Sequence, residues 1–580
     1  MAKLVSADLT GNQLCTLTYT TTDGKMLSLK ENIFDFNVKI ISHTYRDMGE
    51  ILFDKPITWI REWSFANFCN LISITLPDSV MTIGESAFIG CKNLTNIIIP
   101  NKVTTIGEYT FAYCNNLARV SIPNSVESIG DKAFYGCSSL TRVDISNLSS
   151  WCKVDFGGSY ANPLSYNKRL YLNNIEVVEL IIPSDITGIK SYAFAGCNSL
   201  TNVILPNSVI SIGECAFEGC LNLINITIPN SVTLVESRAF ANCNSLTNMT
   251  IPNGVTEIGD YAFLHCCSLI DITIPDSISS IGWRAFKGCS GELIINSNAL
   301  VAKDYNFANY PNDSDFGWLY GAEFTKLSLG NNITKIGNFA FYGCKNLVNI
   351  TVSNQVTEIG DFTFARCSNL TDIVIPNSVT SIGKGTFRSC SSLKGFYGKF
   401  SSDDGRCLIK DNSIIAYAEA SGTIYKIPDS ITMIGANAFD DCCSLTSVTI
   451  PDSVTSIGGG AFGDCVSLIS ITIPNSVTKI ECCTFCGCAS LANVTIPNTV
   501  TEIESRAFED CTSLTNIVIP NSVTEIGSFT FFNCSNLKTI ICKAEIPPKL
   551  GANAFPEFDT LIVPECCEEA YANSDWKEFL

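Results

Sequence analysis

Hydrophobic and polar positions alternate along most of this chain with a fixed period of 23 residues. In the unit spanning residues 94–114 the apolar positions are Leu94, Ile97, Ile99, Val103, Ile106, Phe111 and Cys114. The first three end in a period-2 alternation followed by Pro100, which predicts a short strand that stops where a backbone donor is missing. Phe111 and Cys114 are three residues apart, which predicts one helical or 3₁₀ turn.

A single coil of this length cannot bury seven apolar side chains by itself. Neighbouring coils must therefore stack, each adding about 4.8 Å of sheet. A repeat period in the twenties with this Leu/Ile spacing is typical of a leucine-rich solenoid. We therefore predict a leucine-rich repeat solenoid with short parallel strands on its concave face and short strands and single turns on its convex face.

One cysteine per unit marks the period, and we call these residues the ladder cysteines. They are Cys69, Cys91, Cys114, Cys137, Cys197, Cys220, Cys243, Cys266, Cys289, Cys344, Cys367, Cys390, Cys442, Cys465, Cys488, Cys511 and Cys534. The side chains of a ladder all point the same way, so we favour buried thiols that donate to a turn carbonyl over disulfides between coils.

The ladder divides the chain into regions. We predict an N-terminal cap at 1–59, a solenoid at 60–540 and a C-terminal cap at 541–580, with irregular insertions at about 146–179, 290–326 and 394–427. The insertions are rich in aromatic residues, which favours irregular coils over flexible linkers. These aromatic residues are Trp151, Phe156, Tyr160, Tyr166, Tyr171, Tyr305, Phe307, Tyr310, Phe316, Trp318, Tyr320, Phe396, Tyr397, Phe400 and Tyr417.

A glycine follows the second strand in most units, as Gly107 follows Ile106. Lys190, Glu236, Glu481 and Glu504 occupy the same slot in other units. A side chain there argues against a left-handed backbone, so a close approach or a turn preference is the better interpretation.

Charge and histidine content restrict the function. The 37 Lys and Arg against 56 Asp and Glu give a net charge of −19, which argues against binding to nucleic acid or anionic membranes. Only two histidines occur, His43 and His265, so a three-histidine metal site is excluded. No apolar run has the roughly 18 residues of a membrane span, and residues 1–8 do not resemble a secretion signal.

The repeat resembles a known family. The unit Leu-Thr-x-Ile-x-Ile-Pro-Asn-Ser-Val-Thr-x-Ile-Gly-x-x-Ala-Phe-x-x-Cys, which covers residues 60–540, is similar to the BspA-like (Treponema-type) leucine-rich repeats. The segments 150–156, 318–321, 396–399 and 563–579 resemble interruptions and end caps of Bacteroides-type surface proteins. The resemblance implies a cell-surface or secreted protein that adheres to host matrix proteins, other cells or glycans.

The outward strand positions are the candidate binding surface. Their middle slots hold Asn96, Arg119, Arg142, Asn202, Asn225, Asn248, Asp271, Asn349 and Asp372, and the next outward slot is mostly Thr. A polar, nearly uncharged face suits many hydrogen bonds to a large ligand. The alternative is that Thr and Asn merely solvate the sheet.

The sequence argues against a metal site. Cys482, Cys483, Cys486 and Cys488 lie within seven residues, a density that can indicate zinc, but their slots in the unit point in divergent directions. The acidic pairs Asp313/Asp315 and Asp403/Asp404 lack the register of a calcium loop. We expect no metal, no cofactor and no catalytic residue.

Two functions remain open. The first is a monomeric, non-enzymatic adhesion protein of the cell surface that recognises a protein or glycan through the concave face and the aromatic insertions. The second, favoured by the missing signal peptide and the many free thiols, is a cytoplasmic scaffold for protein–protein interaction.

Overall fold

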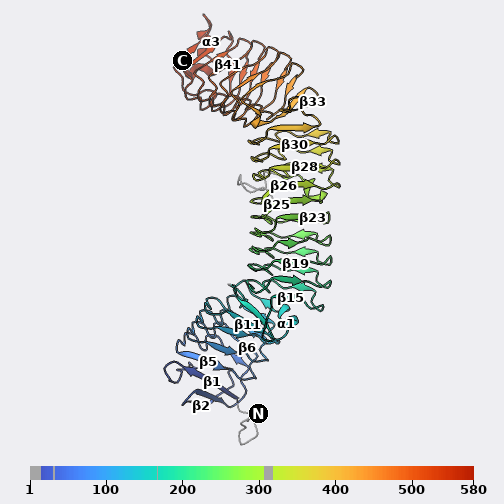
Figure 1. The fold of residues 1–580 in the computed structure, drawn as a ribbon. Coiled ribbons are helices and arrows are strands. Elements are labelled where there is room, and N and C mark those ends of the chain that lie inside the picture. The colour runs from blue at the N-terminus through green and yellow to red at the C-terminus, as the bar shows by residue number, and fades with distance from the viewer. Residues whose placement is uncertain (1–14, 31–32, 166, 306–317, 580) are drawn as a thin grey trace. The chain divides into compact units, whose positions relative to one another are not determined.

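The chain folds into stacked coils that form two compact units, Met1–Ser290 and Gly291–Leu580 (Figure 1). The structure is a computed structural model and describes residues 15–30, 33–165, 167–305 and 318–579. Each regular coil contributes one strand to a first strand row and a two-residue strand to a second strand row. Stacked parallel strands confirm the predicted solenoid.

Parallel strands build the first strand row of the first unit. These strands are β5 (Leu71–Thr75), β7 (Asn96–Ile98), β9 (Arg119–Ser121), β11 (Arg142–Ile145), β13 (Arg169–Leu172), β15 (Glu179–Ile181), β17 (Asn202–Ile204), β19 (Asn225–Thr227), β21 (Asn248–Met249) and β23 (Asp271–Ile274). They form three successive sheets that end at β13, at β21 and beyond β23. Asn96 pairs with Arg119, 23 residues later. The inward side chains of these strands are buried, except for the half-buried Met249, so the register follows the sequence period.

The second strand row of this unit is shorter per coil but equally regular. It consists of β4 (Trp59–Ile60), β6 (Thr82–Ile83), β8 (Thr105–Ile106), β10 (Ser128–Ile129), β12 (Asp155–Phe156), β16 (Gly188–Ile189), β18 (Ser211–Ile212), β20 (Leu234–Val235), β22 (Glu257–Ile258) and β24 (Ser280–Ile281). Pairing runs from β4 to β12 and resumes from β16 to β24. The first insertion therefore interrupts this row between β12 and β16.

The ends of the first row carry antiparallel strands. At the N-terminal end, β1 (Cys15–Thr21) pairs with β5 and with β3 (Gly49–Phe53), which pairs with β2 (Ile40–Tyr45). In the first insertion, α1 (Leu148–Cys152) precedes β12, and β13 returns through β14 (Ile175–Glu176) as a hairpin. Because β12 and β13 continue both rows in register, this insertion is an additional coil with a hairpin attached.

The second unit repeats the arrangement. Its first row contains β26 (Glu323–Leu329), β28 (Asn349–Thr351), β30 (Asp372–Ile375), β32 (Gly395–Gly398), β35 (Ile424–Lys426), β37 (Ser447–Thr449), β39 (Ser470–Thr472), β41 (Asn493–Thr495), β43 (Asn516–Ile519), β45 (Thr539–Cys542) and β47 (Thr560–Ile562). Its second row contains β27 (Lys335–Ile336), β29 (Glu358–Ile359), β31 (Ser381–Ile382), β34 (Ser413–Tyr417), β36 (Met433–Ile434), β38 (Ser456–Ile457), β40 (Lys479–Ile480), β42 (Glu502–Ile503), β44 (Glu525–Ile526) and β46 (Lys549–Leu550).

The remaining elements belong to the insertions and the C-terminal end. They are β25 (Ser290–Ile295) at the boundary of the units, α2 (Asn298–Val301), β33 (Cys407–Lys410), the 3₁₀ turn Glu419–Ser421, α3 (Glu568–Ala572) and the 3₁₀ helix Asp575–Phe579. In the third insertion β33 forms a hairpin with β34. At the C-terminal end, Trp576 packs on Phe555, the last ring of the phenylalanine stack, and is fully buried. Residues 307, 310, 313, 315 and 316 of the second insertion lie outside the described residues.

Stacked phenylalanines and ladder cysteines fill the core between the rows. Phe240 lies between Phe217 and Phe263, with ring centroids 5.5 Å apart on both sides and planes within 6° of parallel. The thiol of Cys243 donates to the carbonyl of Phe217 at 3.1 Å, and Cys114 and Cys511 donate to the corresponding carbonyls at 3.2 Å. The predicted role as buried donors to turn carbonyls is confirmed for most ladder cysteines, whereas Cys69 is exposed and Cys344 is half-buried.

The recurrent glycine after the second strand reflects close packing of coils. At Gly107 an added Cβ would lie 2.5 Å from the backbone nitrogen of Glu85, and φ is not positive. This confirms the close-approach interpretation. The left-handed residues lie at two other slots of the turn, exemplified by Tyr109 (φ 50°) and Tyr113 (φ 60°), which the sequence pattern did not reveal.

We predict that Phe240→Ala lowers the free energy of unfolding of the first unit by about 3–5 kcal/mol, because it leaves a cavity between two stacked rings. Ile210→Ala removes an exposed side chain and should change stability by no more than about 0.5 kcal/mol. Urea unfolding of both variants measures the difference. Equal effects would contradict a core carried by the phenylalanine stack.

Candidate functional site

The predicted site residues lie in columns on the first strand row. Asn96, Arg119 and Arg142 are successive partners on β7, β9 and β11, and Asn202 pairs with Asn225. Asn225 pairs in turn with Asn248 through the backbone, while Asp271 lies on β23. Asn349 pairs with Asp372 in the second unit. Register therefore aligns these residues within each sheet, and their role in binding stays a prediction.

Arg119 and Arg142 converge on one carboxylate rather than pointing freely outward. Arg119 Nε lies 2.5 Å from Asp144 Oδ2, and a terminal nitrogen of Arg142 lies 2.6 Å from Asp144 Oδ1. Both guanidinium groups also donate to Asn174 Oδ1, at 3.3 and 2.9 Å. The Arg142 guanidinium carbon lies 4.0 Å from the centroid of the Tyr171 ring, within cation–π distance. We call these five residues the arginine cluster.

The electrostatics of the arginine cluster are those of a partly buried ion pair. Burial of Asp144 raises its pKa, but the hydrogen bonds from Arg142 and Arg119 outweigh burial, and the net pKa is lowered. The Asp144 side chain is 8% exposed, against 50% for Arg119. The carboxylate therefore stays ionised at neutral pH and holds both arginines in place.

Sequence reasoning missed two members of this cluster. Asp144 occupies the slot of Ser121 in the preceding strand, so a charge replaces a small polar residue there. Asn173 and Asn174 form the left-handed turn of the β13–β14 hairpin, with φ values of 50° and 69°. An Asn-Asn pair between two short strands is a hairpin signal that was present in the sequence.

A group of exposed aliphatic side chains follows the arginine cluster along the chain. We call Val178, Ile181, Ile204 and Ile224 the aliphatic patch; their exposed fractions are 46, 60, 37 and 43%. Ile181 and Ile204 are direct partners on β15 and β17, and Thr201 links the backbones of Val178 and Ile224. The outward slot that is mostly Thr elsewhere therefore holds Ile in β15 and β17.

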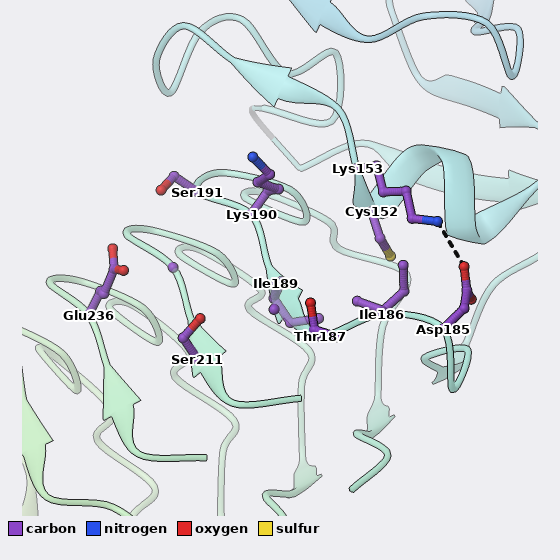
Figure 2. A pocket seen from close by; sticks show the side chains of 12 residues that line it. Cys152, Lys153, Asp185, Ile186, Thr187, Ile189, Lys190, Ser191, Ser211 and Glu236 are labelled. Atoms are coloured by element: carbon purple, nitrogen blue, oxygen red, sulfur yellow. Dashed lines mark hydrogen bonds and ion pairs between the residues drawn. The ribbon is translucent and has the colours of Figure 1, made fainter. Parts of the chain in front are cut away.

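A cavity of about 310 Å³ opens where the second strand row resumes after α1 (Figure 2). Gly188 carries no side chain at the slot where the next strand has Ser211, which leaves the hollow. Lys153 is held by Asp185 at 2.8 Å, and Lys190 by Asp155 at 2.6 Å. Because both ammonium groups are already paired, the cavity suits a neutral hydrogen-bonding group better than an anion.

The described residues include two histidines and many cysteines and carboxylates. They contain no group of three or more His, Cys, Asp or Glu placed to hold a metal ion. His43 Nε2 lies 2.6 Å from the Tyr19 hydroxyl, and burial lowers its pKa. His265 lies 3.3 Å from the Asn242 side chain. Nor does any helix in the described part of the chain have the length and apolar character to cross a bilayer.

We predict that Arg142→Ala destabilises the first unit by about 1–3 kcal/mol at pH 7, because it removes half of the compensation for a buried charge. The pKa of Asp144 is lowered in the folded state, so this stabilisation is present above the unfolded pKa near 4 and is lost at lower pH. Arg169→Ala is the matched control, since its partner Glu176 is 30% exposed. Urea unfolding at pH 7 and pH 3 measures the stability of both variants. Equal losses of stability in the two variants would contradict this prediction.

Comparisons with known proteins agree with the repeat. A leucine rich cell surface protein from Faecalibacterium prausnitzii is 27% identical (68% of this chain, 90% of that chain, TM-score 0.37). A leucine-rich repeat protein from Bacteroides ovatus is 23% identical (84% and 95%, 0.33), and the pneumococcal vaccine antigen PcpA is 19% identical (68% and 86%, 0.33). A search of curated proteins finds no match.

A family model matches the repeat directly. The family model described as the BspA type leucine rich repeat region matches residues 38–160, 166–292, 316–402, 413–538 and 460–561. These segments cover well over half of the chain and contain both strand rows and the ladder cysteines. The chain belongs to the BspA-type leucine-rich repeat family.

Proposed function

We propose that this chain is a non-enzymatic binding protein that recognises a protein ligand through the first strand row of its first unit. The observation that carries the proposal is the aliphatic patch, whose four exposed side chains lie on the consecutive strands β15, β17 and β19 and the residues beside them. Exposed aliphatic side chains on neighbouring strands of a sheet that is otherwise Asn- and Thr-rich are typical of an interaction surface.

A protein ligand suits this surface better than a glycan. Aliphatic side chains offer apolar contact but no hydrogen bonds, whereas a sugar presents mainly hydroxyl groups. Arginine is enriched in protein interfaces, and Asn174 of the arginine cluster precedes Val178 of the patch by four residues. Because Arg119 and Arg142 are already paired with Asp144, the cluster contributes shape and hydrogen-bonding groups rather than free positive charge.

We further propose that the ligand is met at the cell surface, where it belongs to the host extracellular matrix or to another cell. Family membership supports this location, and the similar Faecalibacterium protein is itself a leucine rich cell surface protein. The Asn-rich columns and the insertions would extend the contact beyond the patch.

The test is an array of purified extracellular matrix proteins and glycans probed with the full chain. We predict that the double variant Ile181→Thr/Ile204→Thr weakens binding to the recognised matrix protein at least tenfold, which corresponds to about 1.4 kcal/mol. The same slot holds Thr227 in β19, so the melting temperature should be unchanged.

Ile98→Thr is the matched control, because Ile98 on β7 is 60% exposed, as Ile181 is, but lies outside the patch. It should bind as the unaltered chain does. Binding that is confined to glycans, or an equal loss in the control variant, would overturn the proposal.

A further inference from the structure

Three cysteines outside the ladder lie on one turn of the second unit, directly after β40. Cys482 is exposed, and Cys483 and Cys486 are half-buried. The ladder residue of the same turn, Cys488, is buried and donates to the carbonyl of Phe462 at 3.1 Å. The turn therefore carries three accessible thiols beside one structural thiol.

The geometry of the turn brings these thiols together. Cys482 Sγ and Cys483 Sγ are 3.4 Å apart. The Cys486 N–H donates to the Cys483 carbonyl at 3.1 Å, which closes a four-residue turn. Such a turn holds its end Cα atoms within about 7 Å, close to the roughly 4.4–6.8 Å range of disulfides. Adjacent residues are only about 3.8 Å apart, so a bridge to Cys482 is geometrically poorer.

The neighbouring coils leave Cys483 open on one side and place a cation on the other. Cys483 occupies the left-handed slot of the turn (φ 57°), where Gly460 (φ 65°) precedes it and Arg506 (φ 60°) follows it one coil away. In other coils the side chain at this position stacks on the side chain of the next coil, as Phe339 does on Phe362. A glycine cannot cover its neighbour, so a small reagent can approach Cys483 from the Gly460 side.

The pKa values of the Cys483 and Cys486 thiols are shifted in opposite directions. Hydrogen bonds from Cys486 and Cys482, with help from Arg506, lower the pKa of Cys483 to about 6 against the effect of burial. The pKa of Cys486 is raised by its hydrogen bond to Cys483 and by burial. Glu509 Oε2 lies 3.7 Å from Cys486 Sγ and can accept its proton. At neutral pH the turn thus presents one thiolate next to a protonated thiol.

We propose that Cys483 and Cys486 form a thiol–disulfide exchange site that reacts with a low-molecular-weight disulfide and closes into an intramolecular disulfide. This inference does not depend on the proposed ligand binding. It gives a chemical role to the cysteine cluster, whose density in the sequence can also indicate a zinc site. The thiols that it uses are not part of the buried core.

The exchange has two steps. The Cys483 thiolate attacks one sulfur of R–S–S–R, so that a Cys483–S–SR bond forms, the original S–S bond breaks and R–S⁻ leaves to take a proton from water. Cys486 then gives its proton to Glu509 or water and attacks Cys483 Sγ, which expels the second R–S⁻. Two protein thiols lose two electrons in total, and one small disulfide becomes two small thiols.

The test treats the native full chain with oxidised glutathione at pH 6, blocks the remaining thiols with iodoacetamide and identifies the peptides by mass spectrometry. We expect a Cys483–Cys486 bridge while the ladder thiols stay reduced. At pH 6, Cys483 should react about tenfold faster than in urea-unfolded chain, since its larger thiolate fraction outweighs its lower nucleophilicity.

Two variants identify the roles. Cys486→Ser should stop at the glutathione adduct of Cys483, and Cys483→Ser should form neither the adduct nor the bridge. The matched control Cys567→Ser, which alters another half-buried thiol of a Cys-Cys pair, should leave bridge formation unchanged. Bridging to Cys482, equal reactivity in native and unfolded chain, or no adduct in Cys486→Ser with the fold intact by circular dichroism would overturn the proposal.

Discussion

The structure depends on one constraint, which is that a 23-residue coil cannot cover its own apolar side chains and must be covered by its neighbours. The stacked rings, such as Phe217, Phe240 and Phe263, satisfy this constraint by dispersion and apolar burial. Most ladder thiols add a hydrogen bond between coils, because they donate to a carbonyl of the preceding coil. Periodicity in the sequence is the direct expression of this mutual coverage.

That constraint explains which features the sequence predicted well. Inward positions and the close approach at Gly107 recur in almost every coil, so they were visible by counting. The arginine cluster was not, because its contacts join β9, β11 and the hairpin through side-chain geometry that no period encodes. In the sequence, Asp144 is one more polar residue at a position that holds a small polar residue in the preceding strand. Only the structure shows the two arginines that surround it. The left-handed slots were missed because Tyr109, Arg506 and Cys483 share no side-chain chemistry, only a backbone conformation.

The interruptions show how the same constraint creates surface variety. Where α1 enters, the second row stops at β12 and resumes at β16, and the first row stops at β13 with its added hairpin and resumes at β15. The hairpin supplies Asn174 to the arginine cluster, and the break in the second row leaves the cavity beside Gly188. An insertion thus costs little in the shared core, because β12 and β13 still pair in register, yet it changes both outer faces.

We therefore expect function in such a scaffold at outward positions where the residue type differs from that at the same position in neighbouring coils. An Ile in a column of Thr makes an apolar patch, and an Asp between two Arg makes a fixed polar cluster. A Cys between Gly460 and Arg506 makes a thiol that is both open to a small reagent and stabilised as a thiolate. None of these substitutions disturbs the stacked interior, since each side chain leaves its coil on the solvent side. The regular core allows such departures to accumulate independently, so the proposed binding surface and the proposed exchange site can lie in separate units.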